Sequence, residues 1–153
     1  MRSNQLVKQE DIDAIIKKCN VCHIGMIDNG GQPYVLPMNF GYENGVIYLH
    51  SSQKGRKIDI LKVNPQVCIE FSTDYLLRFQ SEEVACSYSM KYRSVLAYGK
   101  VEFVEDPTDK IAHLNIVMKN YTPLPFTYGL PSLKEVSCWK VKVERFEGKV
   151  FGY

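Results

Sequence analysis

Two runs of strand-forming residues, separated by Asn44-Gly45, place the strongest constraint on how this chain can fold. They extend from Tyr34 to Tyr42 and from Val46 to Leu49, and both contain aromatic and β-branched side chains that favour strands. Asparagine followed by glycine tolerates the positive φ angles that a tight turn between two strands requires. The pattern therefore predicts a β-hairpin.

Pro37 limits the pairing of the first run, because proline has no N–H group to donate to a neighbouring strand. This predicts that the strand is an edge strand or is bulged at that point. Alternation places the larger side chains on one face: Tyr34, Leu36, Met38, Phe40 and Tyr42. The opposite face is small and lightly polar: Val35, Pro37, Asn39 and Gly41. Unpaired backbone beside that face can hydrogen-bond a flat heterocycle, or it can form the solvated edge of an ordinary hairpin.

The second run leads through His50-Ser51-Ser52 and Gly55 into Arg56-Lys57, where the helical pattern IDILKV begins. Free N–H groups and the positive end of the helix dipole meet at such a position, so hydroxyls, a glycine and two cations predict a phosphate site. The alternative is a solvated cationic pair. Cations are disfavoured at a helix N-terminus, which favours the bound anion over that alternative.

The ordered pattern P-Y-V-x-P-M-N-F-G-Y, then G-x-I-Y-x-H-S, then G-R-K resembles the flavin-binding hairpin of the pyridoxamine-5′-phosphate-oxidase-like split-barrel family. It is similar in particular to the 5-nitroimidazole-resistance (nitroimidazole reductase) branch. The resemblance implies a mainly β fold, a six- to seven-stranded antiparallel split β-barrel with peripheral helices. It also implies a homodimer with one flavin per subunit near the interface, either FMN or, as the alternative, FAD.

The same resemblance assigns three groups of residues to the flavin. Its phosphate is bound by Ser51, Arg56 and Lys57, and the Ser52 hydroxyl can donate to it too. The isoalloxazine ring is held mainly by main-chain groups of Pro37, Met38, Asn39 and Phe40. The strand that passes beside the flavin contains Arg93, Ser94 and Val95. Without the resemblance, the hairpin residues are ordinary packing and Arg93 is a surface charge.

His50 is the side chain best suited to catalysis, and it also belongs to the expected cofactor contacts. An imidazole can donate a proton or orient a substrate near neutral pH. His50 corresponds to the histidine found near the flavin in the nitroimidazole-resistance branch. The alternative is a strand-end histidine that is hydrogen-bonded to backbone. His23 and His113 have no comparable context, and we expect both to be structural.

The resemblance implies a flavin-dependent reductase that passes electrons from a nicotinamide nucleotide to a small planar acceptor, such as a nitroheteroaromatic compound. The chain ends in RFEGKVFGY and has no C-terminal Arg-Leu motif, so oxidation of pyridoxamine phosphate is not expected. A non-catalytic flavin store or sensor is the alternative from another class, because the catalytic side chains are few. A haem-binding relative of the same barrel is the third hypothesis.

Composition excludes several other classes of protein. With 153 residues, 45% of them hydrophobic, we expect a single domain over 1–153. A net charge of +2 gives no electrostatic support for binding to nucleic acid or to a membrane surface. The first residues lack an apolar signal core, which predicts a cytoplasmic protein. Five cysteines, an odd number, predict reduced thiols rather than a disulfide framework.

Cys19-Asn20-Val21-Cys22-His23 matches the c-type haem attachment pattern. Covalent haem attachment normally needs export, and Cys19 falls on the apolar face of a predicted helix, so we expect a buried thiol instead. No second cysteine pair completes a zinc site, and we expect no metal. Trp139, the only tryptophan, is expected to pack in the core or at a dimer interface.

The remaining elements follow from periodicity and from capping residues. Helices are expected over 9–19, from Arg56 to about Val63 with Asn64-Pro65 as the stop, and after Asp106-Pro107. The last of these helices should bury Ile111, Leu114, Met118 and Tyr121. Further strands are expected over 21–27, 66–71, 85–104 and 136–145, with loops over 73–84 and 122–133.

Overall fold

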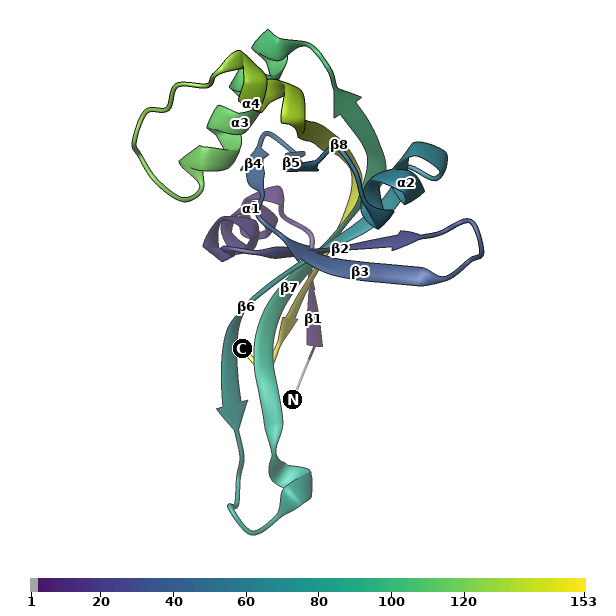
Figure 1. Cartoon of the computed structure of the whole chain (residues 1–153). Helices are drawn as coiled ribbons and strands as arrows, with labels where there is room; N and C mark the ends of the chain where they lie inside the picture. Colours follow the sequence, from purple (N-terminus) through teal and green to yellow (C-terminus); the bar gives the residue numbers. More distant parts are fainter. Residues whose placement is uncertain (1–2) are drawn as a thin grey trace.

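The computed structural model describes residues 3–153, which form one eight-stranded antiparallel sheet with helices around it (Figure 1). The strands are β1 (Ser3–Leu6), β2 (Cys22–Ile27), β3 (Pro33–Met38), β4 (Gly41–Glu43), β5 (Val46–Ser52), β6 (Gln66–Arg78), β7 (Ser89–Val104) and β8 (Val136–Phe151). The helices are α1 (Gln9–Lys18), α2 (Arg56–Val63), α3 (Pro107–Lys119), α4 (Leu130–Glu135) and the short 3₁₀-helix η1 (Ala85–Ser87). The mainly β class is confirmed, with eight strands where six or seven were expected.

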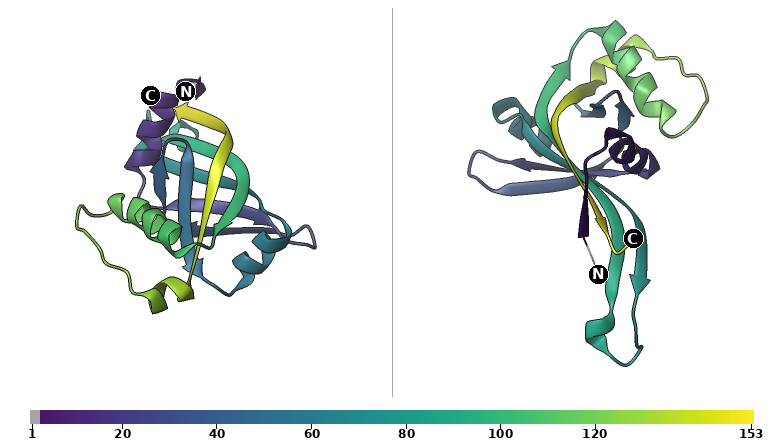
Figure 2. Two further views of the ribbon diagram at one scale, coloured as in Figure 1. Left: turned by 90° about the horizontal axis from the view of Figure 1, so that it is seen from above. Right: turned by 180° about the vertical axis from the view of Figure 1, so that it is seen from behind.

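The strands follow the order β3-β2-β6-β7-β8-β5-β4, and β1 adds to β8 outside this path. Seen from above, the sheet curls round into a barrel, with α3 lying against one side of it (Figure 2). Large apolar side chains that are fully buried fill the interior of the barrel, among them Phe40, Phe71 and Trp139. Trp139 therefore packs in the core, one of the two places expected for it.

The Asn44-Gly45 turn forms as predicted, with φ of 51° at Asn44 and 76° at Gly45. The run before it, however, is two strands rather than one. β4 pairs with β5 across the turn, whereas β3 pairs with β2. β3 is the last strand at its end of the sheet, so Pro37 lies on an edge strand, as expected. The chain breaks between β3 and β4 where Phe40 turns inward and becomes fully buried.

The hairpin formed by β6 and β7 projects far beyond the barrel, and β1 and the C-terminus lie beside it (Figure 1). The prediction of a loop over 73–84 is wrong for residues 73–78, which continue β6 past an irregularity between Thr73 and Leu76. Seven large apolar side chains on this hairpin are exposed: Tyr75, Leu76, Leu77, Phe79, Val84, Tyr88 and Met90. We call residues 75–90 the arm.

α3 begins as expected, because the Asp106 side chain accepts hydrogen bonds from the N–H groups of Thr108 and Asp109. Its buried face differs from the prediction: Lys110, His113, Leu114 and Val117 are buried, and of the four expected residues only Leu114 is among them. Periodicity selects apolar positions, and this helix instead buries two polar ones. Lys110 is accommodated because its Nζ donates to the carbonyls of Leu133 and Val136, at 3.1 and 2.9 Å.

α2 ends at Val63 before Asn64-Pro65, and α1 covers Gln9–Lys18, both as predicted. None of the helices in residues 3–153 has the length and apolarity needed to span a bilayer.

Candidate functional site

β4 and β5 pair across the Asn44-Gly45 turn, with Gly41 opposite Tyr48. Gly41 itself lies against α3, where an added Cβ would be 2.8 Å from the Ile116 backbone. The predicted ring-binding residues 37–40 therefore lead directly into the strand that pairs with β5, and β5 continues into the predicted phosphate-binding residues 50–52.

Two main-chain groups of residues 37–40 are engaged within the chain. The Phe40 N–H donates to the Tyr121 hydroxyl at 2.9 Å, and the Met38 carbonyl accepts from the Cys22 thiol at 3.6 Å. The side chains of Met38 and Phe40 are buried in the core. Pro37 and Asn39 are exposed. Contact of residues 37–40 with a planar ring stays a prediction.

β5 continues through a hydroxyl-rich turn into α2. Ser51 Oγ donates to the Ser52 carbonyl at 2.9 Å, and Ser52 Oγ donates to the Lys54 carbonyl at 2.8 Å. Gly55, with φ of 122°, precedes the helix and provides no side-chain cap. Arg56 and Lys57 are the first two residues of α2, where backbone N–H groups have no partner within the helix. Two cations and free N–H groups thus meet at the N-terminus of an eight-residue helix.

Arg56 is already engaged by its own chain. Its Nη2 lies 3.4 Å from Oδ2 of Asp28, in the turn between β2 and β3, and its guanidinium is 4.4 Å from the centre of the Tyr34 ring. Hydrogen bonds from the N–H groups of Gln32 and Gly30, together with Arg56, lower the pKa of Asp28 below its ordinary value. Sequence reasoning missed that Asp28 lies beside the predicted phosphate site, because its partner Arg56 is 28 positions away.

His50 lies on the face of β5 that meets α3, and burial lowers its pKa below the ordinary value. Its Nδ1 is buried without a hydrogen-bond partner. The expected alternative, a histidine bonded to backbone, describes His113 instead, whose Nε2 lies 2.8 Å from the Leu49 carbonyl oxygen. His50 therefore keeps both nitrogens free of partners in the described part of the chain.

Arg93, Ser94 and Val95 lie far along the sheet from His50. His50 pairs with Cys138, and Cys138 pairs with Val104, so Val104 is the residue of β7 that is level with His50. Ser94 lies ten positions from Val104 along β7. At about 3.3 Å per residue, that is roughly 33 Å measured along the strand. Arg93 is occupied by an ion pair with Asp74 at 2.7 Å, and Val95 is buried in the core. One chain does not bring these three residues to the predicted phosphate site.

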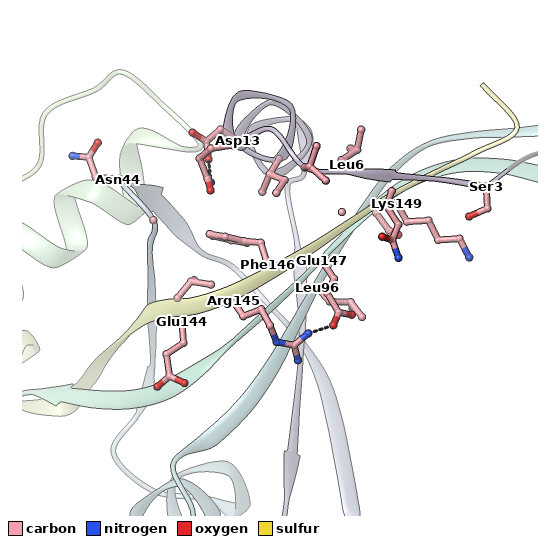
Figure 3. Close-up of a pocket in the computed structure, with 18 residues that line it drawn as sticks. Ser3, Leu6, Asp13, Asn44, Leu96, Glu144, Arg145, Phe146, Glu147 and Lys149 are labelled. Atoms are coloured by element: carbon pink, nitrogen blue, oxygen red, sulfur yellow. Dashed lines mark hydrogen bonds and ion pairs between the residues drawn. The ribbon is translucent and has the colours of Figure 1, made fainter.

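Two cavities in the described part of the chain are each lined by one predicted cofactor residue. A cavity of about 1260 Å³ opens between α1, the Asn44-Gly45 turn and the strands β7 and β8, and Ser94 is the only predicted cofactor residue that lines it (Figure 3). Figure 3 shows Arg145 paired with Glu147 at its margin. A smaller cavity, of about 410 Å³, lies beside Asp28, Arg56 and Asp59.

The profile of the family described as pyridoxamine 5′-phosphate oxidase matches residues 8–150, almost the whole chain. The chain belongs to the pyridoxamine 5′-phosphate-oxidase-like family. Its fold is accordingly that family's split barrel. No curated protein matches the chain.

Solved structures agree with membership of the pyridoxamine 5′-phosphate-oxidase-like family. A protein from Bacteroides thetaiotaomicron, named as a candidate 5-nitroimidazole antibiotic resistance protein, is 43% identical, with a TM-score of 0.89 over 98% of this chain and 88% of that one. The flavocytochrome Anf3 from Azotobacter vinelandii is 23% identical, with a TM-score of 0.83 over 97% and 70%. An FAD- and haem-binding protein from Mycobacterium smegmatis is 15% identical, with a TM-score of 0.86 over 97% and 74%. The latter two show the fold alone.

Pyridoxamine 5′-phosphate-oxidase-like proteins include flavoproteins, and the residues at the start of α2 fit such a cofactor. Arg56 and Lys57 offer charge and the helix offers N–H groups, which together suit a phosphate. Covalent haem does not fit at 19–23: Cys22 is fully buried and Cys19 is 5% exposed. Burial also raises the pKa of Cys19 to about 11 and that of Cys22 to about 12, so neither thiol is reactive. Residues 3–153 hold no metal-binding cluster of three or more His, Cys, Asp or Glu side chains.

Proposed function

We propose that the chain is a flavin-dependent reductase acting on small planar acceptors, with FMN as its cofactor and FAD as the alternative. The observation that carries this proposal is the packing of Arg56, at the cationic start of α2, over Tyr34 of β3, the strand that leads through Pro37 to Asn39. The 43% identity to a candidate 5-nitroimidazole resistance protein supports reduction of a nitro group as the reaction.

Each part of the candidate site has a role in this proposal. Lys57 and the first N–H groups of α2 hold the flavin phosphate. The hydroxyls of Ser51 and Ser52, which donate to the carbonyls of Ser52 and Lys54 in this structure, turn to the phosphate instead. Arg56 adds a second cation once it is shared with, or released from, Asp28. Pro37 and Asn39 border the ring. A bound flavin would supply the redox chemistry, with a nicotinamide nucleotide as electron donor.

His50 orients the acceptor and supplies a proton to it. Its lowered pKa makes the neutral imidazole the main form at pH 7, so it acts first as a hydrogen-bonding group. A positioned imidazole is expected to contribute on the order of 10²-fold or more to a step that moves a proton.

We also propose that the working unit is a homodimer in which a second copy completes the site. Ser94 lies ten positions along β7 from Val104, the residue that is level with His50. A flavin bound at His50 would therefore contact Arg93–Val95 of a second subunit rather than those of its own. The exposed apolar side chains of the arm suit contact with that subunit. Sedimentation of the wild type and of Leu77→Glu tests this: the variant should be monomeric. Leu124→Glu, equally exposed but outside the arm, should leave the dimer intact; a monomeric wild type would refute the proposal.

The function is tested on the purified protein in two steps. The absorption spectrum and the mass of the co-purifying ligand decide between FMN, FAD and haem. Incubation with a 5-nitroimidazole and reduced nicotinamide nucleotide, followed by mass spectrometry, should then yield the amine. The same mixture with protein stripped of ligand is the control. A flavin-loaded protein that gives no amine would sink the reductase proposal.

The second candidate is a flavin store or sensor without turnover. The observation that favours it is the scarcity of catalytic side chains at the candidate site, where His50 alone is poised to move a proton and Arg56 is partly neutralised by Asp28. His50→Ala distinguishes the two. A variant that keeps its flavin but loses nitro reduction supports the reductase. Unchanged behaviour in every redox assay supports storage.

A further inference from the structure

The arm leaves the barrel at a β-bulge in β6. Thr73 of β6 pairs with Arg93 of β7. The next pair is Leu76 with Lys91, so β6 has one residue more than β7 in between, and such an extra residue bends and twists a strand. Asp74, inside the bulge, has a φ of 57°, a conformation that few residues other than glycine adopt. A backbone of this kind persists where its surroundings hold it.

The surroundings of Asp74 hold both its side chain and its main chain. Arg93 and Lys18 bind the carboxylate, with nitrogen–oxygen distances of 2.7 and 3.0 Å. The Tyr153 hydroxyl donates to the main-chain carbonyl of Asp74 at 2.5 Å. The Arg93 guanidinium in turn lies 4.0 Å from the centre of the Tyr153 ring. Asp74, Arg93 and Tyr153 thus form a closed ring of contacts around the bulge, which we call the latch.

The bulge decides which side chains of the arm share a face with Ser94. Alternation places Met90 and Ser94 on one face of β7, and Leu77 pairs with Met90, so Leu77 lies on that face too. Without the extra residue the register of β6 would shift by one, and Leu77 would turn to the opposite face. We call the face of the arm that carries Leu77 and Met90 the docking face.

The docking face is apolar and continues toward the larger cavity. Leu77 and Met90 are 55% and 43% exposed. Beyond them Tyr92 stacks on Phe151, with ring centres 5.5 Å apart. Ser94, which lines the cavity, is four positions from Met90 along β7, or roughly 13 Å at about 3.3 Å per residue. A protein that covers the docking face therefore also borders the cavity at Ser94.

We propose that Tyr153 is a positioning residue for the arm: it keeps the bulge at Asp74 formed and so holds the docking face toward a second copy of this chain. The occupant is a second copy because the docking face continues to Ser94, which lies in the strand proposed to border the flavin of another subunit. An arm held in one conformation loses less conformational entropy on docking. The docking role rests on the proposed homodimer, whereas the latch itself does not.

Hydrogen exchange measured by mass spectrometry tests the latch in a protein that cannot dimerise through the arm. In the Leu77→Glu background, Tyr153→Phe removes the hydrogen bond to Asp74 but keeps the ring beside Arg93. We expect the amides of residues 73–92 to exchange roughly two- to tenfold faster, the effect of losing one hydrogen bond. Equal exchange in Leu77→Glu with and without Tyr153→Phe would overturn the proposal.

Tyr98→Phe is the matched control for that exchange experiment. Tyr98 also has an arginine, Arg145, 4.0 Å from the centre of its ring, and its hydroxyl donates to Glu147. It lies outside the arm, so its hydroxyl should be removable without faster exchange over residues 73–92. Faster exchange of the arm in both variants would show a general loss of stability and would count against the latch.

Sedimentation of the protein with Leu77 intact tests what the latch does for docking. Tyr153→Phe should raise the dissociation constant of the dimer roughly two- to tenfold. Tyr153→Ala, which also loses the stack on Arg93, should raise it further, and wild-type circular dichroism shows that the fold survives. An unchanged dissociation constant in Tyr153→Ala would refute the docking role. A monomeric wild type would refute the proposed homodimer and that role together, while the exchange rates would still decide whether Tyr153 holds the bulge.

Discussion

Arg56 and Asp28 form an ion pair that links the start of α2 to the turn between β2 and β3, with Nη2 of the arginine 3.4 Å from Oδ2 of the aspartate. The same arginine is one of two cations expected at the flavin phosphate. If the phosphate binds there as proposed, the aspartate and the phosphate compete for one guanidinium. Asp28 would then change the affinity for the cofactor without itself contacting the phosphate.

Asp28→Asn should strengthen flavin binding. The amide still accepts from Gly30 and Gln32, so the turn is kept, while Arg56 loses its charged competitor. Exposed ion pairs are weak, so we expect FMN to bind roughly two- to fivefold more tightly, measured by the quenching of flavin fluorescence. Riboflavin, which has no phosphate, should bind equally to both proteins. Asp59→Asn, at the same cavity but not paired with Arg56, is the matched control.

Lys57→Gln should weaken the binding of FMN far more than that of riboflavin. A charge-assisted hydrogen bond to a phosphate contributes roughly 1.5–3 kcal/mol, which corresponds to a loss of about ten- to a hundredfold in affinity. Lys62→Gln, in the last turn of the same helix, removes an equal charge away from the N-terminus. Similar losses for the two variants would show that the phosphate does not bind at the start of α2.

Tyr121→Phe should loosen the edge between β3 and β4. The hydroxyl accepts from the Phe40 N–H at 2.9 Å and donates to the Asn20 carbonyl at 2.8 Å, so it ties three segments together. Its loss leaves a partly buried donor unpaired, and urea denaturation should show a decrease of roughly 1–3 kcal/mol in the free energy of unfolding. Tyr128→Phe, which loses an exposed bond to Asn115, should cost much less.

The features that could be predicted from the sequence are those decided by neighbouring residues. Asn44-Gly45 formed its turn, Asp106 capped α3, and Asn64-Pro65 ended α2, because each depends on backbone angles or on hydrogen bonds within a few positions. Local chemistry was sufficient for these. The cofactor role of residues 37–57 stays a prediction.

The features that could not be predicted depend on distant partners. β3 pairs with β2 rather than across the Asn44-Gly45 turn, and no local pattern distinguishes these two pairings. Lys110 and His113 are not among the apolar positions that periodicity assigned to the buried face of α3, yet both are buried, with the carbonyls of Leu133, Val136 and Leu49 as hydrogen-bond partners. The place of Ser94, remote from His50, likewise follows only from the register of three strands.

Lys110→Met should reveal how much the buried ammonium contributes to stability. The side chain keeps its length, but the carbonyls of Leu133 and Val136 lose their donor inside the protein. We expect a decrease of roughly 1–3 kcal/mol in the free energy of unfolding, measured with urea. The exposed Lys119, in the last turn of α3, gives the control Lys119→Met, which should change stability little. A Lys110→Met protein as stable as the wild type would show that the apolar stem alone holds α3 on α4 and β8.

Stability should fall as the pH is lowered from 7 to 5, because His113 is buried in its neutral form. Its pKa is lowered from the ordinary 6.5 to about 4 in the folded protein, so the unfolded chain binds the proton first. The stabilising contribution is therefore complete above pH 6.5 and decreases as the pH falls toward 4. Linkage gives a loss of roughly 2 kcal/mol between pH 7 and pH 5 from this one group, and His50, whose pKa is also lowered, adds to it in the same direction.

Urea denaturation at the two pH values measures this loss in the wild type and in two variants. His113→Gln cannot take up the proton and still bonds to Leu49, so its unfolding free energy should depend less on pH, with only the part due to His50 remaining. His23→Gln, on the surface beside Glu70, should keep the full dependence of the wild type. If His113→Gln and the wild type lose the same stability between pH 7 and pH 5, then His113 is not held neutral against β5.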